Sequence, residues 1–186
     1  MTAPASVRDE KRRIRALLKE RLKEISPEEW RRISSAVCRR LGEDPFYQSA
    51  RSVFCFVGAD AEIDTRPFLE QALLDGKILA VPRCGPGGSM TARIITGLNC
   101  LRPGFWGLME PDEQAPVLPP EETDLAVLPC LGADPKGFRL GRGGGYYDRY
   151  LAGFAGHTLL VCPRKALVPR VPREPFDLGA EKLITD

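Results

Sequence analysis

The densest group of residues that could do chemistry is the segment from Arg139 to Asp148, which reads Arg-Leu-Gly-Arg-Gly-Gly-Gly-Tyr-Tyr-Asp. Its glycines, at positions 141, 143, 144 and 145, have no Cβ, so the backbone can adopt positive φ and bring its N–H groups close to a ligand. Successive amides in such a turn form a concave surface of positive potential that suits phosphate. We therefore predict a phosphate-binding loop here, the alternative being a flexible surface turn.

The charged side chains of this Gly-rich loop (residues 139–148) fit the same ligand. Arg139 and Arg142 supply guanidinium groups, which match phosphate oxygens in a bidentate way. Asp148 supplies a carboxylate of the kind that holds Mg²⁺ beside bound phosphates. A short helix is expected from about Tyr146 to Leu151, and its first turn would add free N–H groups and partial positive charge.

Generic phosphate and metal motifs do not account for the loop. A Walker A loop ends in Gly-Lys-Ser/Thr, which the chain lacks, and a dinucleotide-binding fingerprint requires a glycine where Tyr146 stands. The chain has a single histidine, His157, and none of its cysteines forms a Cys-x-x-Cys pair, so the spacing does not indicate a zinc site.

The elements that must position this loop are short apolar runs of strand length. Such runs occur at residues 51–57, 78–81, 124–128 and 158–162, with a helix expected between the first two and shorter strands at 90–95 and 182–185. Pro82 is expected to close the second run. Strands alternating with helices predict an α/β fold, namely a three-layer α/β/α, Rossmann-like open sheet that is mostly parallel, with helices on both faces.

Ligands of such sheets bind beyond the carboxyl ends of the strands. Glu62 follows the first apolar run, so we expect it at this edge, although a solvated loop acid would look the same. Asp64 or Thr65 is expected to cap the helix that follows. Further along, Trp106 has the flat ring needed to stack on a heteroaromatic ligand, and a tryptophan of the core or rim is the alternative.

Two helices are expected at the start of the chain. Residues 9–25 show an apolar stripe at helical spacing, and Lys11 and Arg15 fall beside it, where they could reach over the rim of a core towards a cleft. The alternative is that they belong to a solvated basic face. Ser26 begins the second helix with a capping box that includes Glu29, and this helix is expected to end at Gly42. Residues 1–7 are expected to be disordered.

Length and composition indicate one globular domain spanning residues 1–186. The chain is 43% hydrophobic and 28% charged, with a net charge of +2 that is not typical of a polyanion-binding protein. No apolar run is long enough to cross a bilayer, and no secretory leader is evident. We therefore expect a cytoplasmic monomer whose six cysteines are reduced, with small-molecule substrates and neither nucleic acid nor membrane as a partner.

The Gly-rich loop resembles the signature of the 5-formyltetrahydrofolate cyclo-ligase family, Arg-Leu-Gly-x-Gly-Gly/Lys-Gly-Tyr-Tyr-Asp. The resemblance extends along nearly the whole chain. It includes a Lys-x-x-Leu/Ile-Arg pattern at residues 11–15, the segment 61–65 around Glu62, and a Gly/Trp-x-Ile-x-Glu/Gln-Pro segment at residues 105–111. It implies an ATP- and Mg²⁺-dependent ligase that cyclises 5-formyltetrahydrofolate to 5,10-methenyltetrahydrofolate.

The resemblance also implies roles for individual residues. Arg142 is the expected catalytic residue, because it would hold the transferring phosphoryl group. The expected ATP-binding residues are Lys11, Arg12, Arg13, Ile14, Arg15, Arg139, Leu140, Gly141, Arg142, Gly143, Gly144, Gly145, Tyr146 and Tyr147. The expected folate-binding residues are Val57, Glu62, Trp106 and Tyr146, with one of the two adjacent tyrosines serving as packing.

One departure from the family concerns the metal. The family carries His-Asp-x-x-x-Asp near its end, where the last Asp is a metal partner, whereas this chain has Phe176, Asp177 and Glu181 at the corresponding positions. We therefore expect Asp148 and Glu181 as metal-binding residues, with Glu181 reaching further by one methylene.

Two other classes of function compete with this interpretation. Residues 1–40 hold twelve Lys and Arg but six Asp and Glu, and a basic helix of this kind can bind nucleic acid. Acidic residues are interleaved with the basic ones, however, and the segment lacks stacking aromatic residues. A sugar-phosphate or acyl-CoA enzyme of similar architecture is the second alternative, since one fold hosts many chemistries.

Overall fold

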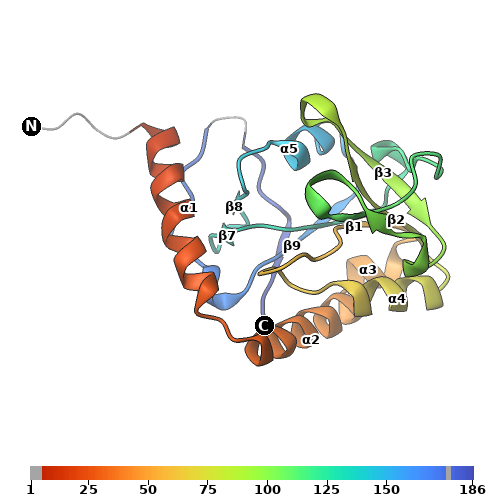
Figure 1. Ribbon diagram of the computed structural model, residues 1–186, viewed down its shortest axis with the longest axis horizontal. Coiled ribbons are helices and arrows are strands. Elements are labelled where there is room, and N and C mark those ends of the chain that lie inside the picture. Colours follow the sequence, from red (N-terminus) through yellow and green to blue (C-terminus); the bar gives the residue numbers. More distant parts are fainter. Residues whose placement is uncertain (1–5, 175–176) are drawn as a thin grey trace, which may run out of the picture.

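A six-stranded, mostly parallel sheet forms the centre of the molecule (Figure 1). The computed structural model describes residues 6–174 and 177–186. The sheet has the order β10-β9-β6-β1-β2-β3, and only the β2–β3 pair is antiparallel. Its strands are β1 (Ser52–Cys55), β2 (Ile78–Cys84), β3 (Met90–Ile95), β6 (Leu125–Leu128), β9 (His157–Val161) and β10 (Lys182–Ile184).

The order of the strands defines where a ligand should bind. The chain begins in the middle with β1, adds β2 and β3 on one side, and then crosses to add β6, β9 and β10 on the other. Ligands of open parallel sheets bind at such a switch point, beyond the carboxyl ends of the strands. Here the switch point lies between β1 and β6, so the loops that follow these two strands should form the site.

The central strands form where the sequence is continuously apolar. All four residues of β1 and of β6 are buried, and the registers Val53↔Leu125 and Phe54↔Ala126 place their apolar side chains at matching heights. Strands buried on both faces read as unbroken apolar runs because they have no polar face. The predicted α/β fold with a mostly parallel open sheet is therefore confirmed.

The helices cover the sheet unequally. They are α1 (Val7–Lys23), α2 (Pro27–Glu43), α3 (Pro45–Ser49), α4 (Arg66–Leu74) and α5 (Tyr146–Tyr150). Helices α2 and α4 lie together on one face, while α5 lies on the other, where Tyr150 packs on Phe54 at 4.4 Å between ring centroids (Figure 1). Leu18 of α1 packs against Gly132, which follows β6, and α1 also contacts the turn Arg164–Ala166, which follows β9. These contacts hold α1 at the carboxyl edge of the sheet.

Short elements complete the described chain. Two small antiparallel pairs are formed by β4 (Arg102–Pro103) with β5 (Met109–Glu110) and by β7 (Gly132–Ala133) with β8 (Arg139–Leu140). Single 3-10 turns occupy Pro86–Gly88, Leu98–Cys100, Phe105–Gly107, Pro120–Glu122 and Arg164–Ala166. Within the described residues, no helix has the length and apolar character that crossing a bilayer requires.

The helix ends follow the sequence signals, with some differences. Ser26 caps α2 as expected, because its side chain accepts a hydrogen bond from the Glu29 amide at 3.2 Å. The Glu29 carboxylate binds Lys165 Nζ at 2.9 Å instead of completing a capping box. At the first helix, Ser6 accepts a bond from the Asp9 amide and α1 starts at Val7. The expected disorder of residues 6 and 7 is therefore wrong; residues 1–5 lie outside the described part.

The sequence predicts that Pro82 ends its strand. This prediction is wrong, because Pro82 lies inside β2, opposite Ala92. The β1 partners of β2 extend only to Ala80, so beyond that point β2 has a neighbour on the β3 side alone. A proline, which has no N–H to donate, can remain in a strand that is open on one side. The antiparallel β2–β3 hairpin therefore projects past the carboxyl edge of the parallel strands.

Candidate active site at the carboxyl edge of the sheet

The Gly-rich loop connects β8 to α5. Its backbone conformation requires glycine at two positions. Gly143 and Gly145 have φ of 106° and 67°, values that residues with a Cβ rarely adopt. Helix α5 has only five residues and ends at Tyr150, so the partial charge expected from its dipole contributes little. The anion-binding capacity of the loop must therefore come from its own amides and from nearby side chains.

The amides of the loop are free to bind a ligand. Among the hydrogen bonds within residues 6–174 and 177–186, none is donated by a backbone N–H of residues 141–145. Protein amides without a partner are normally satisfied by water or a ligand. Five consecutive free donors in a turn rich in positive φ are the arrangement expected of a phosphate-binding loop.

Helix α1 brings two of its basic side chains to this loop. Arg15 Nε donates to the carbonyl oxygen of Gly141 at 2.9 Å, and a Cβ at Gly143 would lie 3.7 Å from Arg15 Cζ. Lys11 Nζ lies 2.5 Å from Asp177 Oδ2. The side chains one turn apart on α1 therefore reach over the core towards the loop, as their position beside the apolar stripe indicates.

The other residues expected from the same pattern do not reach the loop. Arg12 is 80% exposed and pairs with Asp9, and Arg13 is exposed. Ile14 packs against the core, and Leu140, although it belongs to the Gly-rich loop, is buried in the core as well. Because successive residues of a helix are 100° apart, only positions three or four residues apart share a face. The structure thus divides the expected ATP-binding set into Lys11 and Arg15, which face the site, and Arg12 and Arg13, which do not.

The central contact of the site joins two residues that sequence analysis selected independently. Arg142, from the Gly-rich loop, donates through Nε and Nη2 to Glu62 Oε1 at 3.1 and 2.8 Å. Glu62 comes from the loop after β1 and Arg142 from the segment after β6, so their contact lies at the switch point of the sheet. The side chain of Glu62 is 19% exposed and that of Arg142 is 57% exposed. The pair is therefore accessible to a ligand.

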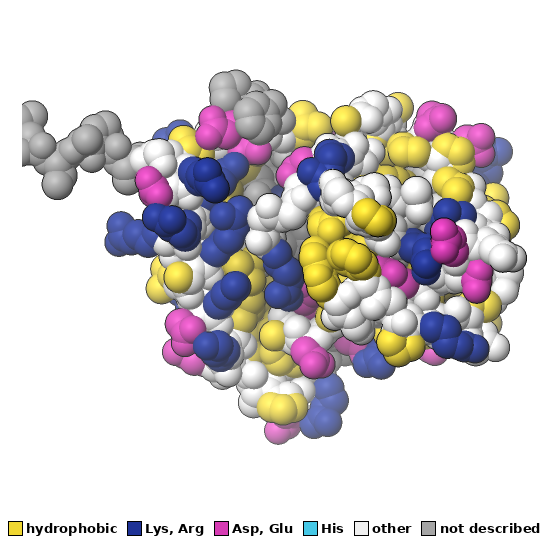
Figure 2. All heavy atoms as spheres, turned by 45° about the horizontal axis from the view of Figure 1, so that its top comes forward, with side chains coloured by type: hydrophobic (Ala, Val, Ile, Leu, Met, Phe, Trp, Pro, Cys, Tyr) yellow, Lys and Arg dark blue, Asp and Glu magenta, His cyan; other side chains and the backbone are white. Residues whose placement is uncertain are grey.

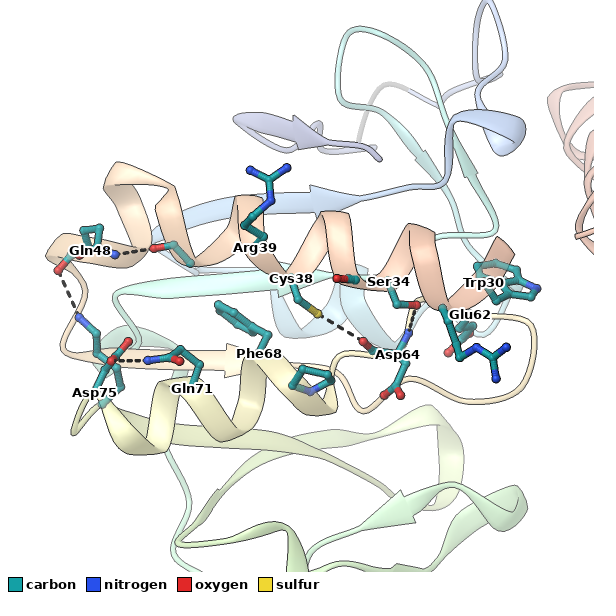
Figure 3. A pocket seen from close by; sticks show the side chains of 15 residues that line it. Trp30, Ser34, Cys38, Arg39, Gln48, Glu62, Asp64, Phe68, Gln71 and Asp75 are labelled. Atoms are coloured by element: carbon teal, nitrogen blue, oxygen red, sulfur yellow. Dashed lines mark hydrogen bonds between the residues drawn. The ribbon is translucent and has the colours of Figure 1, made fainter. Parts of the chain in front are cut away.

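The loop that carries Glu62 is held on its inner side. Thr65, which is fully buried, accepts a bond from the Gly58 amide at 3.1 Å and donates to the Phe56 carbonyl at 2.7 Å. From α2, Ser34 accepts a bond from the Asp64 amide at 2.9 Å (Figure 3). Ala61, directly before Glu62, has φ of 57°. These contacts fix the direction in which Glu62 projects.

A groove of about 910 Å³ between α2 and α4 meets the site only at Glu62. Figure 3 shows Glu62 and Trp30 at one end of this groove and Gln48 and Asp75 at the other. In this groove Arg39 pairs with Glu43, and Lys77 binds the carbonyls of Gln48 and Ala50. Among the described residues that line the groove, Glu62 is the one that contacts a phosphate-binding candidate, Arg142, so we place the site around that contact.

A nearly buried arginine, Arg139, stands at the start of the Gly-rich loop. The side chain of Arg139 is 6% exposed and forms an ion pair with Asp148, which is 63% exposed. The adjacent Tyr147 packs its ring near Phe54, at 6.2 Å between centroids. Burial, followed by the negative charge of Glu62, raises the pKa of the Tyr147 hydroxyl well above its usual value. Tyr147 is thus the packing member of the tyrosine pair and remains neutral.

The outer wall of the site is aromatic. Trp106 is 73% exposed and meets the ring of Tyr146 edge-on, with centroids 5.9 Å apart. Its φ of 56° is strained for a residue with a large side chain. Val57, two residues after β1, is partly buried against the core. An exposed aromatic pair held in a strained turn is suited to contact a flat ligand.

The structure corrects the expected placement of the second acidic residue. Glu181 Oε2 lies 2.8 Å from His157 Nδ1 at the start of β9. Since β10 runs parallel to β9, Glu181 lies just before β10 at the amino edge of the sheet, opposite the Gly-rich loop. It cannot share a metal with Asp148 there. Within the described residues, no three His, Cys, Asp or Glu side chains are grouped to hold a metal.

Asp177 is the acid that lies at the site instead. Partial burial acts to raise its pKa, but hydrogen bonds from Lys11 and the Glu174 amide, together with the charges of Lys11 and Arg139, lower the pKa below its usual value. Asp177 therefore stays ionised and holds Lys11 beside the loop. The sequence led us to expect Glu181, and not Asp177, as the acidic residue at the site. The β9–β10 pairing, which places Asp177 there instead, could not be read from the sequence.

Arg149 is a site residue that sequence analysis missed. Its guanidinium donates to the carbonyl oxygens of Gly88 and Gly144, and lies 5.5 Å from the ring centre of Tyr146. The only signal in the sequence was a third arginine next to the loop. On this face, Lys and Arg side chains gather over α1 and beside a hollow that hydrophobic side chains border on its other side (Figure 2).

Comparisons with known proteins agree with this geometry. A model of the 5-formyltetrahydrofolate cyclo-ligase family matches residues 7–186. The 5-formyltetrahydrofolate cyclo-ligase of Mus musculus is 29% identical, over 98% of this chain and 96% of that protein. The enzyme of that name from Escherichia coli K12 is 26% identical, over 91% and 96%.

A solved structure shows the same fold. The NMR structure of Aquifex aeolicus 5,10-methenyltetrahydrofolate synthetase superposes with a TM-score of 0.82 and 30% sequence identity, covering 94% of this chain and 88% of that one. The family match extends over almost the entire chain and includes the Gly-rich loop, α1 and the Glu62 loop. The chain therefore belongs to the 5-formyltetrahydrofolate cyclo-ligase family.

Proposed function

We propose that the chain catalyses the ATP-dependent cyclisation of 5-formyltetrahydrofolate to 5,10-methenyltetrahydrofolate, with release of ADP and phosphate. One observation carries this proposal. The loop after β1, the Gly-rich loop and one face of α1 meet at the switch point of the sheet, where Arg142 contacts Glu62. Phosphate-binding groups thus lie directly beside a carboxylate and an aromatic wall suited to a pterin.

The reaction needs a better leaving group than the formyl oxygen. Ring closure by the neighbouring anilinic nitrogen would otherwise have to expel hydroxide or oxide. In the proposed sequence, the formyl oxygen attacks the γ-phosphorus and ADP leaves. The nitrogen then bonds to the formyl carbon and loses its proton, and the C–O bond breaks to release phosphate. The protein must mainly position the reactants and neutralise charge during phosphoryl transfer.

The groups on the phosphate side divide by position. The free amides of the Gly-rich loop and the exposed Arg142 are the groups that would hold the transferring phosphoryl unit. Lys11, Arg15 and Arg139 would hold the phosphates further out, because they border the same loop. This chemistry requires no side-chain nucleophile. The described residues of the site instead supply hydrogen-bond donors, namely the loop amides and the basic side chains, for the phosphates.

The groups on the folate side lie across the Arg142–Glu62 contact. A carboxylate at Glu62 can accept hydrogen bonds from adjacent N–H groups of the pterin. Trp106 and Tyr146 would contact the flat rings, and Val57, which is partly buried against the core, would add apolar surface. To bind folate, Glu62 must leave Arg142. Arg142 is 57% exposed and could turn to a phosphate, and pterin N–H groups would replace its two bonds to Glu62.

Asp148 fits a Mg²⁺ ion that arrives with ATP. Mg²⁺ usually keeps several waters and is bound through one or two carboxylates plus substrate phosphates. Asp148 is largely exposed beside the Gly-rich loop, and its present partner Arg139 could pass to a phosphate. When bound, the ion would neutralise charge on the phosphates. Glu181 does not fit this role, since it lies at the other edge of the sheet.

The competing functions explain the site less well. A nucleic-acid-binding protein would use the exposed basic residues of α1, but one of these, Arg12, is paired with Asp9, and Lys11 and Arg15 bind Asp177 and the Gly-rich loop instead. A sugar-phosphate or acyl-CoA enzyme would account for the loop, but it would give no reason for a carboxylate and an aromatic pair beside it.

The direct test is the formation of 5,10-methenyltetrahydrofolate, followed by its absorbance, with 5-formyltetrahydrofolate as substrate. Purified protein with MgATP should produce it, and release one ADP for each product. Omission of ATP, or of the protein, should abolish the signal. Tight ATP binding without any product would show that the phosphate site is real but that its acceptor is a different molecule.

A further inference from the structure

Arg149 connects two loops that are far apart in the sequence. Its Nη2 donates to the carbonyl oxygen of Gly88 at 2.6 Å and to that of Gly144 at 2.6 Å, and its Nε also donates to Gly88 at 3.0 Å. Gly88 belongs to the hairpin tip between β2 and β3 (residues 85–89), and Gly144 belongs to the Gly-rich loop. One guanidinium group therefore holds the two loops together at the rim of the site.

Two glycines leave the room that this guanidinium group occupies. A Cβ at Gly88 would lie 2.3 Å from Arg149 Nη2, and one at Gly145 would lie 2.8 Å from Arg149 Nη1. Both positions also have positive φ, of 79° and 67°. The neighbouring Gly87 has a similar φ of 66°, but a Cβ there would meet nothing within 4 Å. Glycine is thus needed at position 88 to leave room for Arg149, whereas the same requirement does not exist at position 87.

The bond to Gly144 has a consequence for the loop amides. In a trans peptide, the C=O of one residue and the N–H of the next point in opposite directions. The structure contains no cis peptide among the described residues. Because Arg149 holds the Gly144 carbonyl, the Gly145 N–H, which has no protein acceptor among the described residues, must point away from it. A flexible glycine peptide would otherwise rotate readily.

We propose that Arg149 is a positioning residue that sets the shape of the Gly-rich loop for ATP by clamping Gly144 to the hairpin tip. The inference rests on the proposed function in one respect, namely that this loop binds the phosphates of ATP. Arg149 itself need not touch the nucleotide. Its stacking beside Tyr146 carries the same constraint to the aromatic wall, since Tyr146 packs against Trp106.

The geometry favours arginine over lysine. The planar guanidinium presents several N–H groups in a fixed fork and can bind two carbonyl oxygens at once. An ammonium group at the end of a flexible stem can satisfy one carbonyl, but has no rigid fork to hold the second in place. Arg149→Lys should therefore retain part of the contribution that Arg149 makes to ATP binding, and Arg149→Ala should retain none of that contribution.

The first experiment measures MgATP binding by calorimetry, without folate, for wild type, Arg149→Ala and Arg149→Lys. Loss of charged hydrogen bonds should weaken ATP binding roughly 10- to 100-fold in the alanine variant, with an intermediate value for lysine. The matched control is Arg93→Ala, because Arg93 also donates to a backbone carbonyl, that of Ala115 at 2.8 Å. The control should bind ATP as wild type does.

The second experiment works with Arg149 still present. Gly88→Ala should displace the guanidinium and weaken ATP binding, whereas Gly87→Ala carries the same backbone strain without the clash and should not. In an Arg149→Ala background, Gly88→Ala should weaken binding no more than Gly87→Ala does. Equal ATP affinities for the two alanine variants in the Arg149 background would overturn the proposal, even if Arg149→Ala proved unstable.

These results separate the two proposals. A wild-type protein that binds no ATP would refute the proposed function, and with it the reason for the clamp. A wild-type protein that binds ATP, together with an Arg149→Ala variant that matches Arg93→Ala, would refute the clamp alone. If Arg149 acts through the loop, its alanine variant should raise the KM for ATP more than it lowers kcat at saturating ATP.

Discussion

Arg142 and Glu62 contact each other, so a substitution of either residue also changes the surroundings of the other. Without ligands, the guanidinium group and the carboxylate neutralise one another across the site. In the proposed reaction each has a separate task, Arg142 on the phosphate and Glu62 on the pterin. The pair therefore predicts different consequences for the two single substitutions.

Arg142→Ala should lower kcat by about two to four orders of magnitude, the range observed when a charge that stabilises a transition state is removed. Folate binding should be kept or slightly tightened, because Glu62 no longer has a competing partner. Steady-state kinetics and folate calorimetry provide both values. Turnover near that of wild type would remove Arg142 from the reaction.

Glu62→Gln should weaken folate binding while sparing ATP binding. The amide can donate as well as accept, so it matches the donor edge of a pterin less well than a carboxylate does. Calorimetry with each substrate separately is the measurement. Unchanged folate affinity would show that the pterin is held elsewhere.

Asp148→Asn should raise the concentration of Mg²⁺ needed for half-maximal activity, because a neutral amide is a poorer ligand for a hard cation. A titration of activity against Mg²⁺ at constant ATP checks this. Glu181→Gln is the matched control, and it should leave the Mg²⁺ requirement unchanged because Glu181 lies at the opposite edge. A shifted requirement in the control variant would restore Glu181 to the metal site.

At the scale of elements, the site depends on keeping β1 and β6 in register. Asp124, just before β6, accepts hydrogen bonds from the amides of Arg51 and Ser52 at 2.8 and 3.0 Å, at the start of β1. Ser52 Oγ accepts a bond from the Asp124 amide in return. These bonds lock the amino ends of the two strands whose carboxyl ends carry the site.

The same bonds predict how stability depends on pH. Partial burial acts to raise the pKa of Asp124, but the amides of Arg51 and Ser52 outweigh it and lower the pKa. A carboxyl group whose pKa is lower when folded stabilises the protein above its unfolded pKa of about 3.9, and loses this effect as pH falls through the folded pKa. Asp124→Asn should thus lower the unfolding free energy at pH 7 by about 1 kcal/mol.

The difference between wild type and Asp124→Asn should then shrink below about pH 4, as the carboxylate of wild type takes up a proton. Urea unfolding at pH 7 and at pH 3 measures it. Asp112→Asn is a suitable control, because within the described residues the Asp112 carboxylate accepts one local bond, from the Gln114 amide. A difference that stayed constant with pH would mean that packing, and not charge, accounts for the effect.

At the scale of the whole molecule, the core is continuous from α2 and α4 through the sheet to α5. One contiguous core predicts a single cooperative unfolding transition, with equal calorimetric and van't Hoff enthalpies. Differential scanning calorimetry checks this, and saturating MgATP should raise the Tm because it binds only the folded state. Two separate transitions would contradict the assignment of residues 1–186 to one domain.

Much of this protein followed from local sequence signals. The apolar runs identified the buried strands, because a strand covered on both faces has no polar side. Ser26 marked a helix start, and the glycines of residues 139–148 marked a loop with positive φ, because capping and positive φ depend on a few neighbouring residues. Glu62 was placed at the ligand-binding edge by its position after a strand.

Only the tertiary structure decided which of these segments meet. The order of the strands puts β1 beside β6, so Glu62 and Arg142 touch although 80 residues separate them. The parallel pairing of β10 with β9 sends Glu181 to the far edge and leaves Asp177 at the site. The clamp by Arg149 depends on the hairpin tip approaching the Gly-rich loop. Such contacts arise from the packing of distant elements, which local spacing does not encode.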